Sequence, residues 1–222
     1  MAKRVLQDRY FKQAKREGYA ARSAYKLLEI NDRRRVIGPK DAVLDLGCAP
    51  GSWLQVAADA VGPAGVVVGL DLQRADAPVP GRVHALEGDL REIDPDLLLE
   101  PIRRPRGEGE RPPRPDRLFD AVLSDMAPPT TGHGDDLRST HLCRDVLALC
   151  PALLKPRGNL AMKVLEGAEF PDLLAECRGF FNRVGAIKPR ASREVSRETY
   201  VVAQGFWPAG KPRADGPGKA KA

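Results

Sequence analysis

The sequence predicts one α/β domain, with a mostly parallel sheet of seven strands, an antiparallel hairpin at one edge and helices on both faces. Short apolar, β-branched runs alternate with amphipathic helical patterns from residue 42 onward, which is typical of parallel strands joined by crossover helices. The last two strand-like runs follow each other without a helical pattern between them, which favours a hairpin. The 222 residues suffice for one large domain.

Each strand is predicted from a short apolar run bounded by turn residues. In chain order, the strands are expected at 42–47, 65–72, 82–90, 118–129, 158–165, 183–189 and 199–206. Apolar residues at near-helical spacing predict the helices. These are expected at 20–34, 52–62, 95–102, 136–156 and 169–181. Gly47 ends the first strand, Gly62 closes the helix after it, and Pro128 and Pro129 stop the fourth strand.

Positive charge is concentrated in three segments. Residues 1–40 hold twelve Lys and Arg against four Asp and Glu, a net charge of +8. Segments 101–117 (six against three) and 208–222 (four against one) each carry +3, whereas the whole chain carries +6. We therefore expect a basic, RNA-binding N-terminal segment with a helix over 1–40, a catalytic domain over 41–207 and a disordered basic tail over 208–222. The Arg/Pro-rich segment 101–117 is expected to be a surface insertion.

Aromatic residues are interleaved with the cations of the N-terminal segment. They are Tyr10, Phe11, Tyr19 and Tyr25. This mixture favours RNA as the partner, because aromatic rings stack on bases while cations neutralise phosphates.

Other features of the sequence narrow the class of protein. No run of about 18 apolar residues occurs and the N-terminus lacks an apolar signal core, so we expect a cytoplasmic protein without a membrane span. The cysteines form no C-x-x-C pair, which favours buried, reduced thiols. They are Cys48, Cys143, Cys150 and Cys177. The three histidines are scattered, and we expect no metal site.

The loop in "LDLGCAPGSW" (44–53) joins the first strand to its helix, where ligands bind in open α/β sheets. Gly47 and Gly51 would let ligand atoms approach the backbone. Their spacing is G-x-x-x-G rather than G-x-G-x-x-G, and Pro50 lacks an N–H, so the loop is a poor phosphate cradle. A cofactor without a pyrophosphate fits better than NAD, and S-adenosyl-L-methionine is the candidate.

Acidic residues at successive strand ends support this interpretation. Asp71, 20 residues after Gly51, is placed to accept the ribose hydroxyls, and Asp89 is placed to accept from the adenine amino group. Asp45 and Asp125 add negative charge where a sulfonium would lie. Each acid taken singly could instead be a helix N-cap. Trp53 is expected either along the cofactor or in the core.

Lys163 stands in the middle of the fifth strand, among apolar residues. An unpaired buried ammonium costs several kcal/mol, so a partner is expected, and Asp125 at the end of the fourth strand is the candidate. Lys26 and Glu198 are also charged residues in apolar settings. The four could form one neutral cluster, or two unrelated ion pairs.

Five segments together resemble the FtsJ (RlmE/RrmJ) family of ribose 2′-O-methyltransferases. They are "DRYFKQAKREGYAARSAYKLLEI", "VLDLGCAPGSW", "SDMAPPTTG", "MKVLEG" and "SRETYVVAQGF", and the resemblance covers roughly residues 5–207. It implies a Rossmann-like class I methyltransferase fold and catalytic roles for Lys26, Asp125, Lys163 and Glu198. The implied cofactor residues are Gly51, Trp53, Asp71, Asp89 and Asp125.

The resemblance also implies the substrate, a uridine in the peptidyl-transferase region of bacterial large-subunit ribosomal RNA. We expect in-line attack of the ribose 2′-hydroxyl on the sulfonium methyl, without a metal. Lys163 would contact this hydroxyl, either taking its proton as a neutral amine or stabilising the alkoxide as an ammonium. We expect a monomer that meets its RNA within the large ribosomal subunit. The cations expected to hold the RNA are Arg9, Lys12, Lys15, Arg16 and Arg22.

Three other functions remain open at this point. The same fold and the same four residues would serve a 2′-O-methyltransferase acting on tRNA or an mRNA cap. An NAD-dependent oxidoreductase is disfavoured because the dinucleotide glycine pattern and a catalytic His or Tyr near the fourth strand are missing. An RNA-binding assembly factor without activity is disfavoured because all four charged residues are present.

Overall fold

A computed structural model describes residues 2–104, 116–129, 131–192 and 196–210, with side chains from residue 9 onward. The helices are α1 (Ala2–Glu17), α2 (Ala24–Arg34), α3 (Ser52–Val61), α4 (Pro95–Arg103), α5 (Asp135–Leu153) and α6 (Phe170–Phe180). The strands are β1 (Ala42–Leu46), β2 (Val66–Asp71), β3 (Val83–Glu87), β4 (Phe119–Ser124), β5 (Leu154–Leu165), β6 (Phe181–Ile187) and β7 (Glu198–Phe206).

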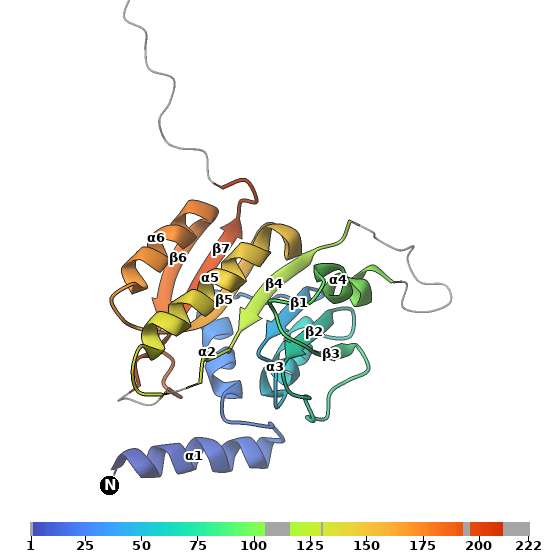
Figure 1. The fold of residues 1–222 in the computed structure, drawn as a ribbon. Helices are drawn as coiled ribbons and strands as arrows, with labels where there is room; N and C mark the ends of the chain where they lie inside the picture. The colour runs from blue at the N-terminus through green and yellow to red at the C-terminus, as the bar shows by residue number, and fades with distance from the viewer. Residues whose placement is uncertain (1, 105–115, 130, 193–195, 211–222) are drawn as a thin grey trace, which may run out of the picture.

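The strands form one sheet in the order β3-β2-β1-β4-β5-β7-β6 (Figure 1). The first five strands in this order are parallel, whereas β7 pairs antiparallel with both β5 and β6. The predicted α/β class, the mostly parallel sheet and the antiparallel edge are confirmed. Because the strand order reverses beside β1, the ends of β1 and β4 mark the switch point where such sheets bind ligands.

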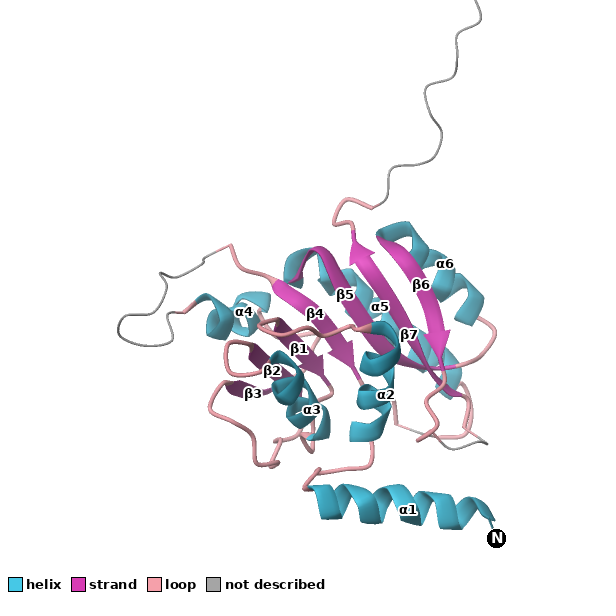
Figure 2. Ribbon diagram, turned by 180° about the vertical axis from the view of Figure 1, so that it is seen from behind, coloured by secondary structure: helices cyan, strands magenta, loops and turns pink. Residues whose placement is uncertain are grey.

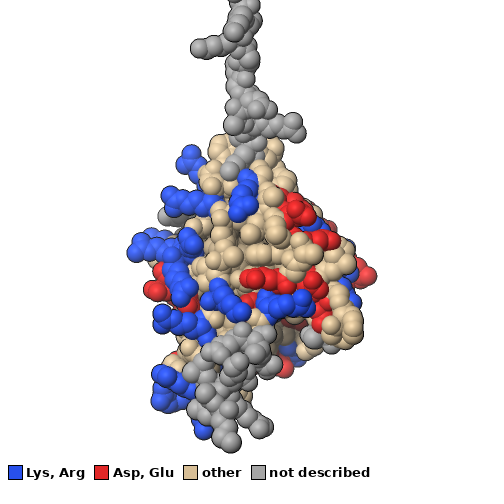
Figure 3. All heavy atoms as spheres, turned by 90° about the vertical axis from the view of Figure 1, so that its left-hand side faces the viewer, with Lys and Arg blue, Asp and Glu red and all other residues tan. Residues whose placement is uncertain are grey.

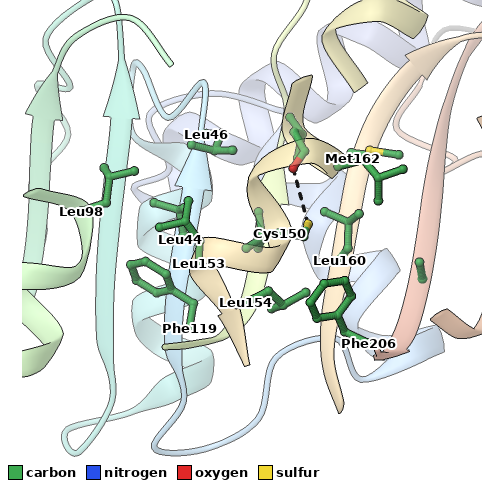
Figure 4. Packing of buried hydrophobic residues seen from close by; sticks show 14 of the residues in the cluster. Leu44, Leu46, Leu98, Phe119, Cys150, Leu153, Leu154, Leu160, Met162 and Phe206 are labelled. Atoms are coloured by element: carbon green, nitrogen blue, oxygen red, sulfur yellow. Dashed lines mark hydrogen bonds between the residues drawn. The ribbon is translucent and has the colours of Figure 1, made fainter. Parts of the chain in front are cut away.

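Apolar side chains alternate between the two faces of the sheet and build two cores. Helices α4, α5 and α6 cover one face (Figure 1), and α2 and α3 cover the other (Figure 2). Figure 4 shows the first core, in which Phe119, Leu160 and Phe206 from three strands pack against Leu153 and Leu154 at the junction of α5 and β5. In the second core, Leu27 and Ile30 anchor α2 to the sheet, so part of the basic N-terminal segment is integral to the fold.

Several boundaries differ from those predicted. The fourth strand stops at Ser124 rather than 129, so Asp125 lies just beyond the strand. The fifth strand starts at Leu154 rather than 158, and its pairing with β4 shifts register there. The residues between, Lys-Pro-Arg-Gly at 155–158, have turn composition, and Arg157 has a left-handed φ of 65°. Helix α1 was not predicted as a helix, because most of its residues are polar and its sequence has no apolar stripe.

All four cysteines are free and buried, as predicted. Burial raises the pKa of Cys143, Cys150 and Cys177 to about 12, so these thiols stay protonated. No described helix is long and apolar enough to cross a membrane. Within the described ranges, no group of three or more His, Cys, Asp or Glu side chains could hold a metal ion. Most of the expected insertion (105–115) and of the expected tail (211–222) lies outside the described residues.

Candidate active site

Several of the residues predicted to bind the cofactor or to act in catalysis lie at the carboxyl ends of the parallel strands. Gly47 follows β1, Asp71 is the last residue of β2, and Asp125 follows β4. Helix α1 lies beyond this same edge of the sheet, apart from the strands, in both ribbon views (Figures 1 and 2). The edge therefore combines the glycine loop, the strand-end carboxylates and the basic N-terminal segment.

Lys163 and Asp125 form an ion pair at this edge. Ser124, the last residue of β4, pairs with Met162 of β5. The residues that follow them, Asp125 and Lys163, therefore lie side by side. The Lys163 Nζ atom lies 3.1 Å from Asp125 Oδ1 and also donates to the backbone carbonyl of Asp125. The lysine projects on the α2 side of the sheet, the opposite side from its buried neighbours Met162 and Val164. This explains how a buried strand accommodates a lysine.

Lys26 and Glu198 form a second ion pair. Lys26 Nζ lies 2.7 Å and 2.8 Å from the two carboxylate oxygens of Glu198, and Ser192 donates to Glu198 Oε1 at 2.8 Å. Burial alone raises the pKa of Glu198, but Lys26, Ser192 and Lys163 outweigh it, so the pKa lies below its ordinary value. The carboxylate is therefore ionised and paired with a lysine that is only 7% exposed.

Tyr200 joins the two ion pairs, and its role was missed from the sequence. Its hydroxyl donates to Asp125 Oδ1 at 2.6 Å, and Lys26 Nζ lies 5.8 Å from its ring centroid. Burial raises the pKa of Tyr200 well above its ordinary value, and Asp125 and Glu198 raise it further, so the phenol remains a donor. The signal was available: Tyr200 stands two residues after Glu198, hence on the same face of β7, and pairs with Lys163.

The glycine loop approaches neighbouring chain segments closely. Gly51 has a φ of 115°, and a Cβ there would come within 2.5 Å of the Ala77 side chain. Gly47, with a φ of 77°, would bring a Cβ within 2.5 Å of Met126. Any side chain at either position would therefore need a strained backbone and a displaced neighbour. Asp71 holds the same loop, because its Oδ2 accepts from the Ala49 N–H at 2.9 Å.

Asp45 is a fully buried carboxyl next to these groups. It is 0% exposed, and among the described residues neither of its oxygens has a hydrogen-bond partner. Burial raises the pKa of Asp45 well above its ordinary value, and the charges of Asp125 and Asp71 raise it further. Carboxyl oxygens that are buried without a hydrogen-bond partner are rare, because their desolvation costs on the order of several kcal/mol. The Asp45 carboxyl therefore favours a bound proton or a cation beside it.

The raised pKa of Asp45 gives a testable pH dependence of stability. In the window between its ordinary pKa and its folded pKa, the folded protein binds more protons than the unfolded chain, so stability falls as pH rises. Asp45→Asn removes this term. The melting temperature of the variant relative to wild type should therefore climb as pH rises above the ordinary carboxyl pKa of about 4 in donor-free protein. Differential scanning calorimetry measures it, with the exposed Asp76→Asn as control; a pH-independent difference would contradict the assignment.

Asp89 and Trp53 were predicted from the sequence to contact the cofactor, and in the structure both make contacts within the protein. Asp89 Oδ1 accepts from the Arg91 N–H at 2.9 Å, a local turn contact at the end of β3. Trp53 is 2% exposed, donates to the Ser23 carbonyl at 2.9 Å and lies 5.7 Å from the Tyr200 ring. Trp53 therefore belongs to the core between α2 and α3, and cofactor contact by Asp89 and Trp53 stays a prediction.

The predicted RNA-binding cations lie on and next to α1. Arg9, Lys12, Lys15 and Arg16 are exposed on this helix, and Arg22 is half-buried just before α2. Tyr25 of α2 ties the helix in place: its ring lies 5.4 Å from the Tyr10 ring and its hydroxyl donates to Glu17. The Tyr25 ring also lies 5.9 Å from the Tyr19 ring, so three of the four predicted stacking aromatics pack on one another, while Phe11 stays 63% exposed.

Known proteins resemble this chain along most of its length. Residues 19–206 match the family described as "FtsJ-like methyltransferase". Ribosomal RNA large subunit methyltransferase E of Syntrophobacter fumaroxidans is 43% identical over 200 residues, covering 89% of this chain and 95% of that protein. The protein of the same name from the archaeon Natronomonas pharaonis is also 43% identical over 200 residues, covering 89% of this chain and 73% of its own.

A solved structure resembles the fold as well. A Plasmodium falciparum protein described as a ribosomal RNA methyltransferase superposes with a TM-score of 0.71 at 26% identity, covering 87% of this chain and 100% of that one. The segment matched by the family model includes every strand and all four residues of the two ion pairs.

Proposed function

Because the chain belongs to the FtsJ-like methyltransferase family, we propose that it methylates a uridine ribose 2′-hydroxyl in large-subunit ribosomal RNA, using S-adenosyl-L-methionine. The observation that most supports this proposal is the pairing of Lys163 with Asp125, beside Lys26 with Glu198, at the strand edge that carries the glycine loop. The curated relatives named for ribosomal RNA methylation support the RNA substrate.

The residues present fit S-adenosylmethionine. Gly47 and Gly51, both with a left-handed φ, form a tight loop after β1 that no side chain crowds, and Asp71 presents a carboxylate at the next strand end. The orphaned oxygens of Asp45 suit a cationic ligand, because a positive charge beside them would offset their desolvation. When bound, this donor supplies a methyl carbon activated by positive sulfur. We propose that Gly51, Asp71 and Asp89 hold it.

Lys163 is the residue proposed to meet the ribose hydroxyl. Asp125, itself held by the Tyr200 hydroxyl, fixes the direction of the Nζ atom at the carboxyl ends of the strands, and the Lys163 side chain is 10% exposed. From that position the amine can accept the hydroxyl proton or stabilise the developing alkoxide by hydrogen bonding. Lys26 and Glu198 neutralise each other and complete the polar lining without adding net charge. A metal plays no part in this proposal.

The RNA is proposed to enter from the α1 side. Four of the predicted cations are exposed on α1, beyond the carboxyl ends of the strands: Arg9, Lys12, Lys15 and Arg16. Arg22 lies in the segment between α1 and α2, the helix that carries Lys26. These five positive charges would neutralise phosphates while the target ribose reaches Lys163. Binding carried by such contacts weakens as salt rises.

The substrate is tested by offering purified protein tritiated S-adenosylmethionine with large ribosomal subunits, protein-free ribosomal RNA or tRNA. Subunits from cells lacking this protein should accept label, whereas tRNA should not. Comparing assembled subunits with free RNA also identifies the form that is recognised. Label in tRNA or in a capped mRNA instead of ribosomal RNA would replace the proposal with one of those substrates.

Asp71→Ala should weaken binding of the methyl donor by about tenfold or more, because a charged hydrogen-bond acceptor contributes roughly 1.5–3 kcal/mol. Isothermal titration with S-adenosylhomocysteine measures the affinity. The matched control is Asp76→Ala, which removes an exposed carboxylate of the loop after β2 that pairs with Arg74. Unchanged affinity in Asp71→Ala would remove the residue from the donor site.

A further inference from the structure

A second group of exposed cations lies on the α2 face, away from α1. We call it the α2–β6 strip. Its members are Arg33, Arg34, Arg183, Lys188 and Arg190, all exposed. They come from the last turn of α2, from β6 and from the loop between β6 and β7.

Packing brings these separate segments together at the far end of α2. The Gln204 side chain of β7 donates to the Arg34 carbonyl at 2.9 Å, and Gln204 pairs with Arg183 across the sheet. The Arg34 guanidinium reaches over β6, where its Nη2 atom lies 3.5 Å from the position a Cβ of Gly185 would take. Arg34 and Arg183 are therefore neighbours on one surface.

The other end of the strip adjoins the candidate active site. The Arg190 N–H donates to Glu29 Oε2 at 2.7 Å, and Glu29 stands one helical turn after Lys26 on α2. Two residues further on, Ser192 donates to Glu198. Lys188 Nζ donates to the carbonyl of Ser196, two residues before Glu198. The strip thus runs from the Lys26–Glu198 pair to the carboxyl end of α2.

The positive charge of this surface is largely uncompensated. Arg33 pairs with Glu29, but Arg34, Arg183, Lys188 and Arg190 form no ion pair with any acidic side chain in the described ranges. In Figure 3, Lys and Arg gather along one border of the molecule, whereas Asp and Glu lie mostly toward the other side. Like charges this close repel one another unless an external anion neutralises them.

We propose that the α2–β6 strip binds the sugar–phosphate backbone of a second segment of the RNA substrate. The proposal rests on the proposed function, because the strip begins at the residues that line the methylation site. α1 adjoins the start of α2, and the strip follows α2 to its carboxyl end over roughly 16 Å, so an RNA seated at Lys163 would contact both. Guanidinium groups suit this role because their planar donors match phosphate oxygens.

The test compares Arg183→Gln with Arg178→Gln, which neutralises an exposed arginine on α6, across the sheet from the strip. The probe is a transcript of the peptidyl-transferase region of large-subunit ribosomal RNA, and affinity is measured over a series of salt concentrations. Arg183→Gln should lower the slope of log K against log salt by about 0.7–0.9, and Arg34→Gln/Arg183→Gln by about 1.4–1.8. The double variant should bind about tenfold more weakly at intermediate salt, and Arg178→Gln should match wild type.

A steady-state assay separates RNA binding from chemistry. The double variant should raise the KM for RNA and leave kcat unchanged, because neither arginine touches the Lys163 site. Salt slope and KM equal to those of wild type would overturn the proposal and leave the strip a solvated surface, and an equal loss in Arg178→Gln would overturn it as non-specific. Wild-type protein that binds RNA through the strip but methylates none would instead refute the proposed function.

Discussion

Lys163→Ala should lower kcat by about 10²- to 10⁴-fold, the range expected when a group that accepts or stabilises a proton in the transition state is removed. The side chain lies 3.1 Å from Asp125 Oδ1, so its Nζ atom is held in one place before substrate arrives. Alanine removes both the charge and the proton acceptor, and the neighbouring Lys26 is held by Glu198. Single-turnover methylation of ribosomal RNA measures the loss.

Binding of the methyl donor should survive this change, because the glycine loop and Asp71 do not contact Lys163. Titration with S-adenosylhomocysteine should return a wild-type affinity. Lys155→Ala is the matched control, since Lys155 belongs to the same strand but pairs with Asp120 at its opposite end. A Lys163→Ala variant with near-normal kcat would show that the reacting hydroxyl does not meet this residue.

Lys26→Met should lower the free energy of unfolding by about 3 kcal/mol, because removing one partner of a buried ion pair leaves the other charge uncompensated. The side chains of Lys26 and Glu198 are 9% and 15% exposed, so water screens the remaining carboxylate poorly. For a chain of this size the melting temperature should drop by about 6–12 °C. The double variant Lys26→Met/Glu198→Gln should recover most of the loss, since no unpaired charge remains.

This stabilisation should also depend on pH in a definite direction. The pKa of Glu198 in the folded protein lies below its ordinary value. Its contribution is therefore complete above the ordinary pKa and is lost as pH falls through the folded pKa. The melting-temperature gap between wild type and Lys26→Met should narrow on acidification. A gap that stays constant from neutral to acid pH, or a double variant no more stable than the single one, would contradict the ion-pair account.

Much of the fold was predictable because its signals are local. Apolar runs such as 65–72 and glycine-bounded turns indicated the strands, and their alternation with helices indicated a parallel sheet. The missing helix between the last strands indicated the antiparallel edge. The predicted strand boundaries were wrong where the local amino-acid composition indicates a turn but the chain already pairs with the sheet. β5 includes Lys155 and Pro156 because α5 ends at Leu153 and the next residue already pairs with the sheet. The apolar pattern of the sequence does not predict this early start of the strand.

The candidate site was predictable to the extent that charge in an apolar run is itself a signal. A lysine in the middle of a buried strand predicted an acidic partner for Lys163. The pairing of β4 with β5 places Asp125 beside it, as predicted. Tyr200 was overlooked because an aromatic residue in a strand is unremarkable until its hydroxyl partner is known. The cations of the α2–β6 strip come from two distant segments of the chain, and only packing reveals that they form one surface.

The most direct test of the central claim is the chemical position of the transferred methyl group. Large subunits from cells lacking this protein are incubated with the purified enzyme and tritiated S-adenosylmethionine, and their RNA is digested to nucleosides. The paired lysines and carboxylates beside the glycine loop predict label on a ribose 2′-oxygen, which protects the adjacent phosphodiester from alkaline cleavage. The proposed substrate predicts that this nucleoside is 2′-O-methyluridine. Label on a base, with every ribose hydroxyl unmodified, would contradict the assignment of Lys163 to a ribose hydroxyl.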